Sequence, residues 1–201
     1  MKAELAALLA GPVEPAARGL LGCALSAGGV TVRITEVEAY AGTAGDPASH
    51  AHRGQTPRNA VMFGPSGYAY VYFTYGMHWC LNVVTGPPGE AAAVLLRAGA
   101  VIEGLPLARS RRGSASDRDL ARGPARLCQA LGIDRSAYGA YLLGDGPLQL
   151  APPAAPVPSS AIAAGPRVGV TGAHDRPWRF WLAGDPTVSP YRRHRPRTLS
   201  P

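Results

Sequence analysis

The chain has 201 residues, a formal net charge of +7 and a hydrophobic content of 46%. This hydrophobic content excludes a disordered chain, and the length suits a single domain over residues 1–201 with a sizeable core. No apolar run approaches the roughly 18 residues of a membrane span, so no membrane partner is expected. The basic balance favours a polyanionic partner, although it also fits a plain compositional bias towards arginine.

The first residues predict short helices followed by a strand. Residues 4–9 and 14–22 are the expected helices, which a Gly-Pro pair separates, and residues 23–27 lead into the strand. The end formed by residues 1–12 is expected to be flexible. It is short and carries a glutamate, so it predicts a helix better than it predicts a signal peptide.

Three cysteines, Cys23, Cys80 and Cys128, are far apart, and no Cys-x-x-Cys pair occurs. Their odd number and apolar neighbours predict buried free thiols without structural zinc. Free thiols are typical of a reducing compartment. We therefore expect a cytoplasmic, nucleoid-associated protein in a bacterium, or a nuclear one in a eukaryote, and not a secreted protein.

Residues 30–40 alternate between apolar and polar types, as a half-buried strand does. Glu36 and Glu38 continue the apolar face that begins at Val30. An unpaired carboxylate on such a face is costly. Either the strand has left the core by then and both glutamates are solvated, or at least one of them has a chemical task.

Residues 46–59 are rich in Gly, Pro, Ser and Asn and predict a loop. The loop contains His50 and His52, but nothing in the sequence suggests further ligands nearby, so no metal is expected. A zinc deaminase is disfavoured because its Pro-Cys-x-x-Cys motif is absent. Arg58 is either a contact to the DNA backbone or a structural turn residue.

Two β-prone runs, residues 68–75 and 79–84, flank a glycine and predict a hairpin. Tyr75 would lie at its tip, next to Met77. Tyr72 belongs to a row of tyrosines on one face of the strand. Such a row fits either a hydrophobic core or a solvent-accessible apolar pocket. Asn82 has apolar neighbours and must find hydrogen-bond partners.

The second half of the chain completes the sheet. Residues 91–97 predict a central strand with Arg97 at its mouth, and residues 101–109 predict a helix that Pro106 interrupts. Residues 109–122 are highly charged and form either a mobile loop beside DNA or a solvated connector.

A helix is expected to begin at the Gly-Pro pair of residues 123–124, where Arg122 and Arg126 could reach the DNA backbone. Residues 147–158 should be extended, and residues 167–171 and 178–183 predict closing strands. The arginine-rich end, residues 191–201, is expected to be flexible.

An ordered set of motifs carries a resemblance. They are Glu38-Ala39-Tyr40, Asp46 to His50, Gln55 to Asn59, Tyr70 to Met77 with Asn82, Leu95 to Ala98, Gly123 to Leu131, and Arg167 to Val170. In this order and near this spacing, the chain resembles the alkyladenine (3-methyladenine) DNA glycosylase family. The resemblance covers roughly residues 20–189. The link from Glu38 to His50 is one residue longer than the family pattern, and His50 is preferred over His52 because Asp-Pro-Ala-Ser precedes it.

The resemblance implies a role for each matching residue. Glu38 resembles the general base that activates water. Arg97 and the backbone carbonyl of Val168 resemble the support for that water and the neighbouring phosphate. The remaining implied roles are base-stacking walls at Tyr40, His50 and Tyr72, a guanine-excluding residue at Asn82, and insertion into the duplex by Tyr75 with Met77 beside it.

The family also implies a fold and an activity. The fold expected is α+β, a single domain with a mostly antiparallel curved sheet, surrounding helices and a protruding DNA-inserting hairpin. The activity expected is removal of 3-methyladenine and 7-methylguanine from duplex DNA, with hypoxanthine and ethenoadenine as unranked neutral lesions, by a monomer without cofactor. The only lysine is Lys2, so unless the N-terminal amine serves, no Schiff base and no lyase activity are expected.

Two other classes of protein fit the same residues. A binding protein without catalysis would use the same aromatic residues and arginines. A carbohydrate hydrolase would use Glu36 and Glu38 as its carboxylate pair, which strand spacing would place about 6.5–7 Å apart. The basic charge and the exposed tyrosine at the hairpin tip favour DNA over sugar.

Overall fold

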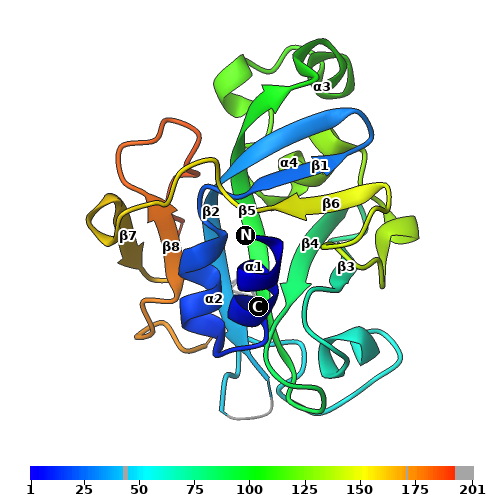
Figure 1. The fold of residues 1–201 in the computed structure, drawn as a ribbon, viewed down its shortest axis with the longest axis vertical. Coiled ribbons are helices and arrows are strands. Elements are labelled where there is room, and N and C mark those ends of the chain that lie inside the picture. Colours follow the sequence, from blue (N-terminus) through cyan, green and yellow to red (C-terminus); the bar gives the residue numbers. More distant parts are fainter. Residues whose placement is uncertain (43–44, 171, 193–201) are drawn as a thin grey trace, which may run out of the picture.

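The computed structural model describes residues 1–42, 45–170 and 172–192. An antiparallel sheet of strand order β3-β4-β5-β2-β1-β6 forms its centre, and the β7–β8 pair joins β2 through β8 (Figure 1). The strands are β1 (Ala24–Ala27), β2 (Val30–Ala41), β3 (Ala69–Thr74), β4 (His78–Val84), β5 (Ala92–Glu103), β6 (Leu148–Ala151), β7 (Ile162–Gly165) and β8 (Arg179–Leu182). The described α-helices are α1 (Lys2–Leu9), α2 (Val13–Leu20), α3 (Leu105–Arg112) and α4 (Pro124–Leu131). This curled sheet with its helices confirms the expected α+β class.

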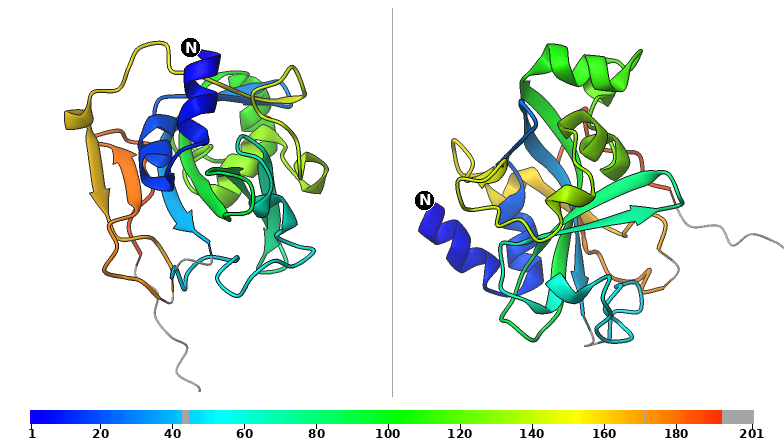
Figure 2. Two further views of the ribbon diagram at one scale, coloured as in Figure 1. Left: turned by 60° about the horizontal axis from the view of Figure 1, so that its bottom comes forward. Right: turned by 90° about the vertical axis from the view of Figure 1, so that its right-hand side faces the viewer.

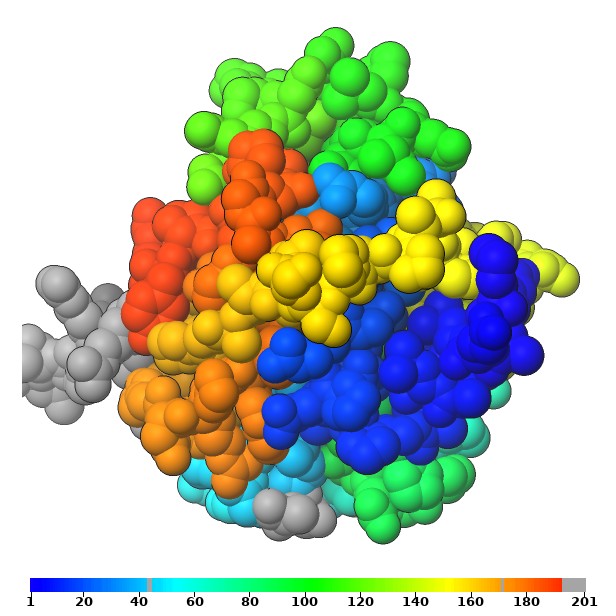
Figure 3. All heavy atoms as spheres, turned by 60° about the vertical axis from the view of Figure 1, so that its left-hand side comes forward, coloured from blue at the N-terminus to red at the C-terminus, as the bar shows by residue number. Residues whose placement is uncertain are grey.

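The two faces of the central strands have different tasks. Neighbouring residues of a strand point to opposite faces, so Val37, Leu81 and Leu96 enter the hydrophobic core. The residues after or before them, such as Asn82 and Leu95, face a pocket on the other side. Helices α1 and α2 cover part of the core, beside the chain that follows β6 (Figure 3, dark blue and yellow). One face is therefore occupied by core packing and the other is available for a site.

Strand β2 is irregular where it carries its two glutamates. Its register with β5 shifts between Ile34 and Glu36 and again between Glu36 and Val37. Such bulges bend a strand and re-aim its side chains. The edge of β2 opposite β5 pairs with β1 over its first half and with β8 at residues 36–38. Both glutamates are thus enclosed between strands, and neither is solvated.

The predicted hairpin is confirmed. Strands β3 and β4 pair over their whole length and project from the body of the molecule (Figure 2, right-hand view). Tyr75 has a φ of 51° and is followed by Gly76 at 69°, so two consecutive left-handed residues close the turn. Glycine adopts this conformation at little cost, whereas tyrosine rarely does. The turn holds the tyrosine side chain outward, with 85% of its surface exposed.

The start of the chain corrects one expectation. Leu5 and Leu9 of α1 are buried in the core, so residues 1–12 are packed into the fold rather than flexible. The expected basic tail falls mainly on residues 193–201, which lie outside the described residues. Each of the four described α-helices has eight residues, too few to cross a membrane.

Two further predictions were wrong. Residues 101–103 continue β5 instead of starting a helix, because the helix begins only after Gly104, whose φ is 72°. Pro106 does not interrupt α3 but lies in its first turn, where proline is tolerated. Residues 167–170 form no strand; the closing hairpin consists of β7 and β8.

Residues 109–122 agree with the solvated connector, one of the two alternatives expected, and they are ordered. Their first part completes α3, and Asp117–Asp119 form a short 3-10 helix. Arg109 makes a two-pronged ion pair with Asp117, with both distances at 2.8 Å. The segment is therefore structured on the surface.

The buried, unpaired cysteines Cys23, Cys80 and Cys128 agree with their prediction.

Candidate active site

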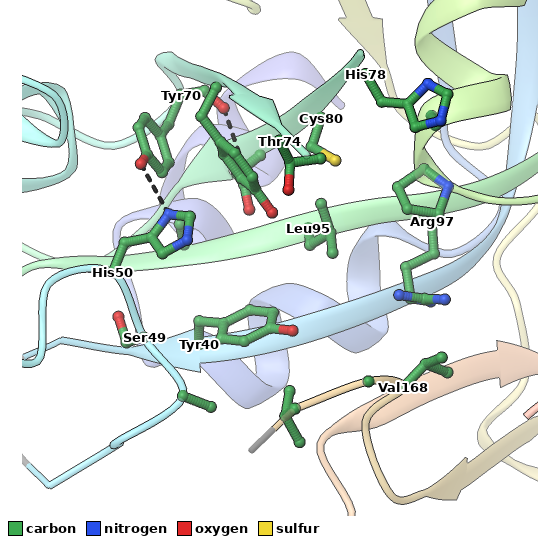
Figure 4. Close-up of a pocket in the computed structure, with 18 of the residues that line it drawn as sticks. Tyr40, Ser49, His50, Tyr70, Thr74, His78, Cys80, Leu95, Arg97 and Val168 are labelled. Carbon is green, nitrogen blue, oxygen red and sulfur yellow. Dashed lines mark hydrogen bonds between the residues drawn. The ribbon is translucent and has the colours of Figure 1, made fainter. Parts of the chain in front are cut away.

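A pocket of about 500 Å³ opens on the face of the sheet away from the core. Its floor is formed by β5, with Leu95 and Arg97, and its sides by β2, the hairpin and two loops. In Figure 4, Tyr40 and His50 lie towards one end of the pocket, and Arg97 and His78 lie at the other. The pocket thus joins residues that the chain separates by more than a hundred positions, since Val168 also lines it.

Aromatic rings form one end of the pocket. The rings of His50 and Tyr72 are 4.5 Å apart between centroids and meet edge to face. His50 Nδ1 lies 2.9 Å from the Tyr70 hydroxyl, which fixes the imidazole. Tyr40 lies on the neighbouring strand β2. Ring faces of this kind can stack on a planar base. Of His50 and His52, only His50 lines the pocket.

Glu38 is fully buried behind three pocket-lining residues. Its Oε2 accepts a hydrogen bond from the Tyr40 hydroxyl at 2.7 Å and lies 3.3 Å from an Arg97 nitrogen. Its Oε1 accepts a hydrogen bond from the backbone N–H of Val168 at 2.7 Å. Both carboxylate oxygens of Glu38 are therefore engaged by pocket-lining residues. The observed Val168 contact is made by the amide N–H, whereas the family resemblance implies a role for the carbonyl.

Glu36 is bound by a different set of partners. Its carboxylate accepts hydrogen bonds from Arg97 Nε and Arg179 Nε, both at 2.8 Å, and from the Ser189 backbone at 2.6 Å. Burial alone would raise the pKa of Glu36, but the two guanidinium groups hold it below its ordinary value. Neither glutamate lines the pocket itself, but all three partners of Glu38 do, whereas Arg179 and Ser189, two of the partners of Glu36, do not. The two glutamates therefore share Arg97 but do not flank one ligand site.

The protonation states of the pocket follow from burial. Burial raises the pKa of Tyr40 and Tyr72, so both phenols remain protonated at neutral pH. Burial lowers the pKa of His50 below its ordinary value of 6.5, and the nearby Arg58 guanidinium adds to this effect. The end of the pocket that these rings form is thus uncharged at neutral pH.

Asn82 and the hairpin tip match their predicted positions. Asn82 is buried, lines the pocket and donates its amide N–H to the Tyr70 carbonyl at 3.0 Å. Tyr75 also lines the pocket mouth, and Met77 is 67% exposed beside it. Apolar side chains this exposed on a projecting hairpin suit contact with a partner.

The three arginines predicted to contact the DNA backbone differ in how firmly other protein groups hold them. Arg58 donates to the Phe73 carbonyl at 3.1 Å and lies over the Tyr72 ring, so it also braces the hairpin. Arg122 donates to the Val188 carbonyl at 2.8 Å. Arg126 is half exposed, with Asp119 4.0 Å away. Arg126 is therefore the least constrained of the three for binding phosphate.

Sequence reasoning missed three residues around the site. Tyr70 is buried and holds His50, and its place in the same alternating row as Tyr72 was the available signal. Asp46 and Arg167 form a buried ion pair beside Tyr40, which no local pattern indicates. Among the described residues, no group of three His, Cys, Asp or Glu side chains could hold a metal ion.

The site as a whole can hold one planar ring between aromatic walls, next to a buried glutamate and an exposed hairpin tip. Comparison with known proteins agrees with this class of site. Residues 7–186 match the model of the family described as "Methylpurine-DNA glycosylase (MPG)". The chain belongs to this family.

Several curated proteins are similar over nearly the whole chain. A protein of Nocardia farcinica (strain IFM 10152) is 58% identical over 90% of this chain and 89% of its own length. One from Streptomyces avermitilis is 55% identical over 92% of this chain and 90% of its own length. One from Frankia casuarinae is 52% identical over 92% of both chains. All three carry the name "Putative 3-methyladenine DNA glycosylase".

Proposed function

We propose that this protein is a DNA glycosylase that removes damaged purines, above all 3-methyladenine and 7-methylguanine, from duplex DNA. The observation that carries the proposal is the Glu38 carboxylate, buried behind an aromatic pocket and held by Tyr40, Arg97 and Val168. Family membership and the names of the relatives support a glycosylase of this kind. Neutral lesions such as hypoxanthine and ethenoadenine lack the positive charge of a methylated purine, so their removal depends on other contacts in the pocket.

The damaged base must leave the duplex to reach the pocket. Extrusion costs a few kcal/mol, and least at damaged pairs. Stacking on aromatic side chains returns ~1–3 kcal/mol per base, so Tyr40, His50 and Tyr72 can offset much of this cost. A cationic methylated purine gains further attraction from the ring faces. Tyr75, exposed at the hairpin tip with Met77, is placed to fill the gap left in the base stack.

Glu38 acts on water in the proposed reaction. Among the described residues, the Tyr40 hydroxyl and the Val168 N–H each occupy one of the carboxylate's roughly four acceptor positions, and an Arg97 nitrogen lies 3.3 Å from Oε2. This leaves an acceptor position for a proton of water. Water adds its oxygen to C1′ as the bond between C1′ and the base nitrogen breaks, and the base departs with the bonding electrons. The proton of the water passes to Glu38, whose negative charge also stabilises the positive charge on the sugar. General-base help of this kind is typically ~10²–10⁴-fold.

The reaction should stop at an abasic site. Strand cleavage by a lyase needs an amine that forms a Schiff base with the sugar. The only lysine, Lys2, lies in α1 and does not line the pocket. Arginine stays protonated and cannot replace it.

A binding protein without catalysis is the remaining alternative, because the same walls would hold a base without hydrolysis. The arrangement of donors around Glu38 favours the enzyme. The carbohydrate hydrolase is disfavoured, because Glu36 is enclosed by Arg97, Arg179 and Ser189, of which only Arg97 lines the pocket.

The test is base release from alkylated duplex DNA, followed by strand-nicking assays with and without alkali. Release of 3-methyladenine or 7-methylguanine, with nicking only after alkali, is the expected result. Nicking without alkali would contradict the monofunctional reaction. DNA binding that weakens with salt, without any base release, would favour the binding protein. Each phosphate contact contributes about −0.9 to the slope of log affinity against log salt concentration.

A further inference from the structure

We propose that Arg167 and Asp46 act as a positioning pair that holds three parts of the pocket in register with Glu38. The inference rests on the function proposed above, since it concerns the same reaction. Neither residue lines the pocket, and neither is among the hydrogen-bond or ion-pair partners of Glu38, so both are positioning residues. Their action would pass through Tyr40, His50 and Val168, which do line it.

The pair is buried and geometrically specific. Both side chains are fully buried, and two parallel hydrogen bonds of 2.7 Å join them. The guanidinium carbon of Arg167 lies 4.6 Å from the centre of the Tyr40 ring, and the same group donates to the Ala39 carbonyl at 2.9 Å. Ala39 stands between Glu38 and Tyr40 in β2. Arg167 is thus fixed to the strand that carries the proposed base and one wall.

The pair also reaches the other two parts of the pocket through the chain. Val168 directly follows Arg167, and the peptide plane between them carries the N–H that donates to Glu38 at 2.7 Å. Asp46 accepts from the backbone N–H of Ala48 at 3.3 Å and opens the loop that ends at His50. A displacement of the ion pair would therefore move the donor of Glu38 and the histidine wall together.

Stability alone is a poor account of this pair. Taking two charges out of water costs several kcal/mol per ion, and well-packed apolar residues often replace a buried ion pair without loss of stability. A fork of two parallel bonds gives directional constraint as well as energy. The position of the pair next to Tyr40 and Val168 places that constraint at the proposed base.

The test is Arg167→Lys, which keeps the charge and removes the fork. Arg33→Lys is the matched control, because Arg33 also lies in an ion pair, with Asp185 at 2.7 Å, but away from the pocket. Single-turnover base release would be measured at saturating enzyme, with lesion-DNA affinity and thermal unfolding in parallel. We expect Arg167→Lys to lower the rate about 10–100-fold, with affinity near that of the wild type, and Arg33→Lys to keep the wild-type rate.

A double-mutant cycle with Glu38→Gln gives the readout that a purely structural role would not move. If Arg167 acts through Glu38, Arg167→Lys should cause no further loss of rate in the Glu38→Gln background. An equal fold-loss in both backgrounds, or an unchanged rate in Arg167→Lys alone, would overturn the inference. Should Arg167→Lys not fold, Asp46→Glu replaces it, and failure of both to fold would assign the pair to stability only. Absence of base release by the wild-type protein would instead refute the proposed function.

Discussion

Replacing Tyr40 with phenylalanine separates two tasks of one side chain. The hydroxyl donates to Glu38 Oε2 at 2.7 Å, while the ring lines the pocket. Burial and the neighbouring Glu38 raise the pKa of Tyr40, so the hydroxyl remains a donor at neutral pH. Tyr40→Phe removes this donor and keeps the wall.

The magnitude follows from the type of hydrogen bond that is lost. A hydrogen bond to a charged group contributes about 1.5–3 kcal/mol, and about 1.4 kcal/mol corresponds to a tenfold change in rate. If the hydroxyl holds Glu38 in its reactive position, the single-turnover rate should fall about 10–150-fold. Lesion binding should change little, because the stacking surface of the ring remains.

The assay compares single-turnover base release with lesion-DNA affinity for the same variant. Tyr141→Phe is the matched control, because this tyrosine is 44% exposed and does not line the pocket. A Tyr40→Phe protein with the wild-type rate would refute the role of the hydroxyl. A loss of affinity as large as the loss of rate would show that the wall, and not the base, had been damaged.

Three further predictions concern the hairpin and the buried acid–base groups. Tyr75→Ser should weaken lesion binding and leave thermal unfolding unchanged, because the side chain is 85% exposed; a cooperative loss of stability would mark it as core. The pKa of Glu36 is lower in the folded protein than its ordinary 4.5, so its contribution to stability is present above that pH and is lost as pH falls through the folded value. Glu36→Gln should therefore flatten the acid side of the stability profile in chemical denaturation, and an unchanged slope would contradict this. The pKa of His50 is also lowered, so an NMR titration should show a neutral ring at pH 6.5, with stability falling as pH decreases through its folded pKa; a midpoint above 6.5 would contradict the assignment.

Local patterns were sufficient for the hairpin and for the glutamate-bearing face of β2. Alternating side chains and one glycine determine where β3 and β4 pair and where Tyr75 stands. The alternation also placed Glu36 and Glu38 on an apolar face, although it left open whether they are solvated or have a chemical task. Both observations depend on neighbours within a few residues, which a sequence displays directly.

The partners themselves could not be predicted, because they are distant in the chain. Glu36 accepts hydrogen bonds from Arg179 and Ser189, which are about 150 residues away in the chain. Glu38 accepts one from the backbone N–H of Val168. The segment around Val168 was expected to be a strand from its apolar residues. Gly169, with a φ of 69°, and the buried fork of Arg167 instead turn the chain so that one amide reaches Glu38. Tertiary contacts there outweighed local β-propensity.

The most direct test of the account is Glu38→Gln. This variant keeps the size of the side chain and one of its two acceptor oxygens, and it removes the negative charge and the capacity to take a proton. Single-turnover base release and affinity for lesion-containing duplex would be measured on the same preparation, with folding checked by thermal unfolding. We predict a rate at least ~100-fold lower with lesion binding retained, whereas near-normal base release by the folded variant would contradict Glu38 as the base.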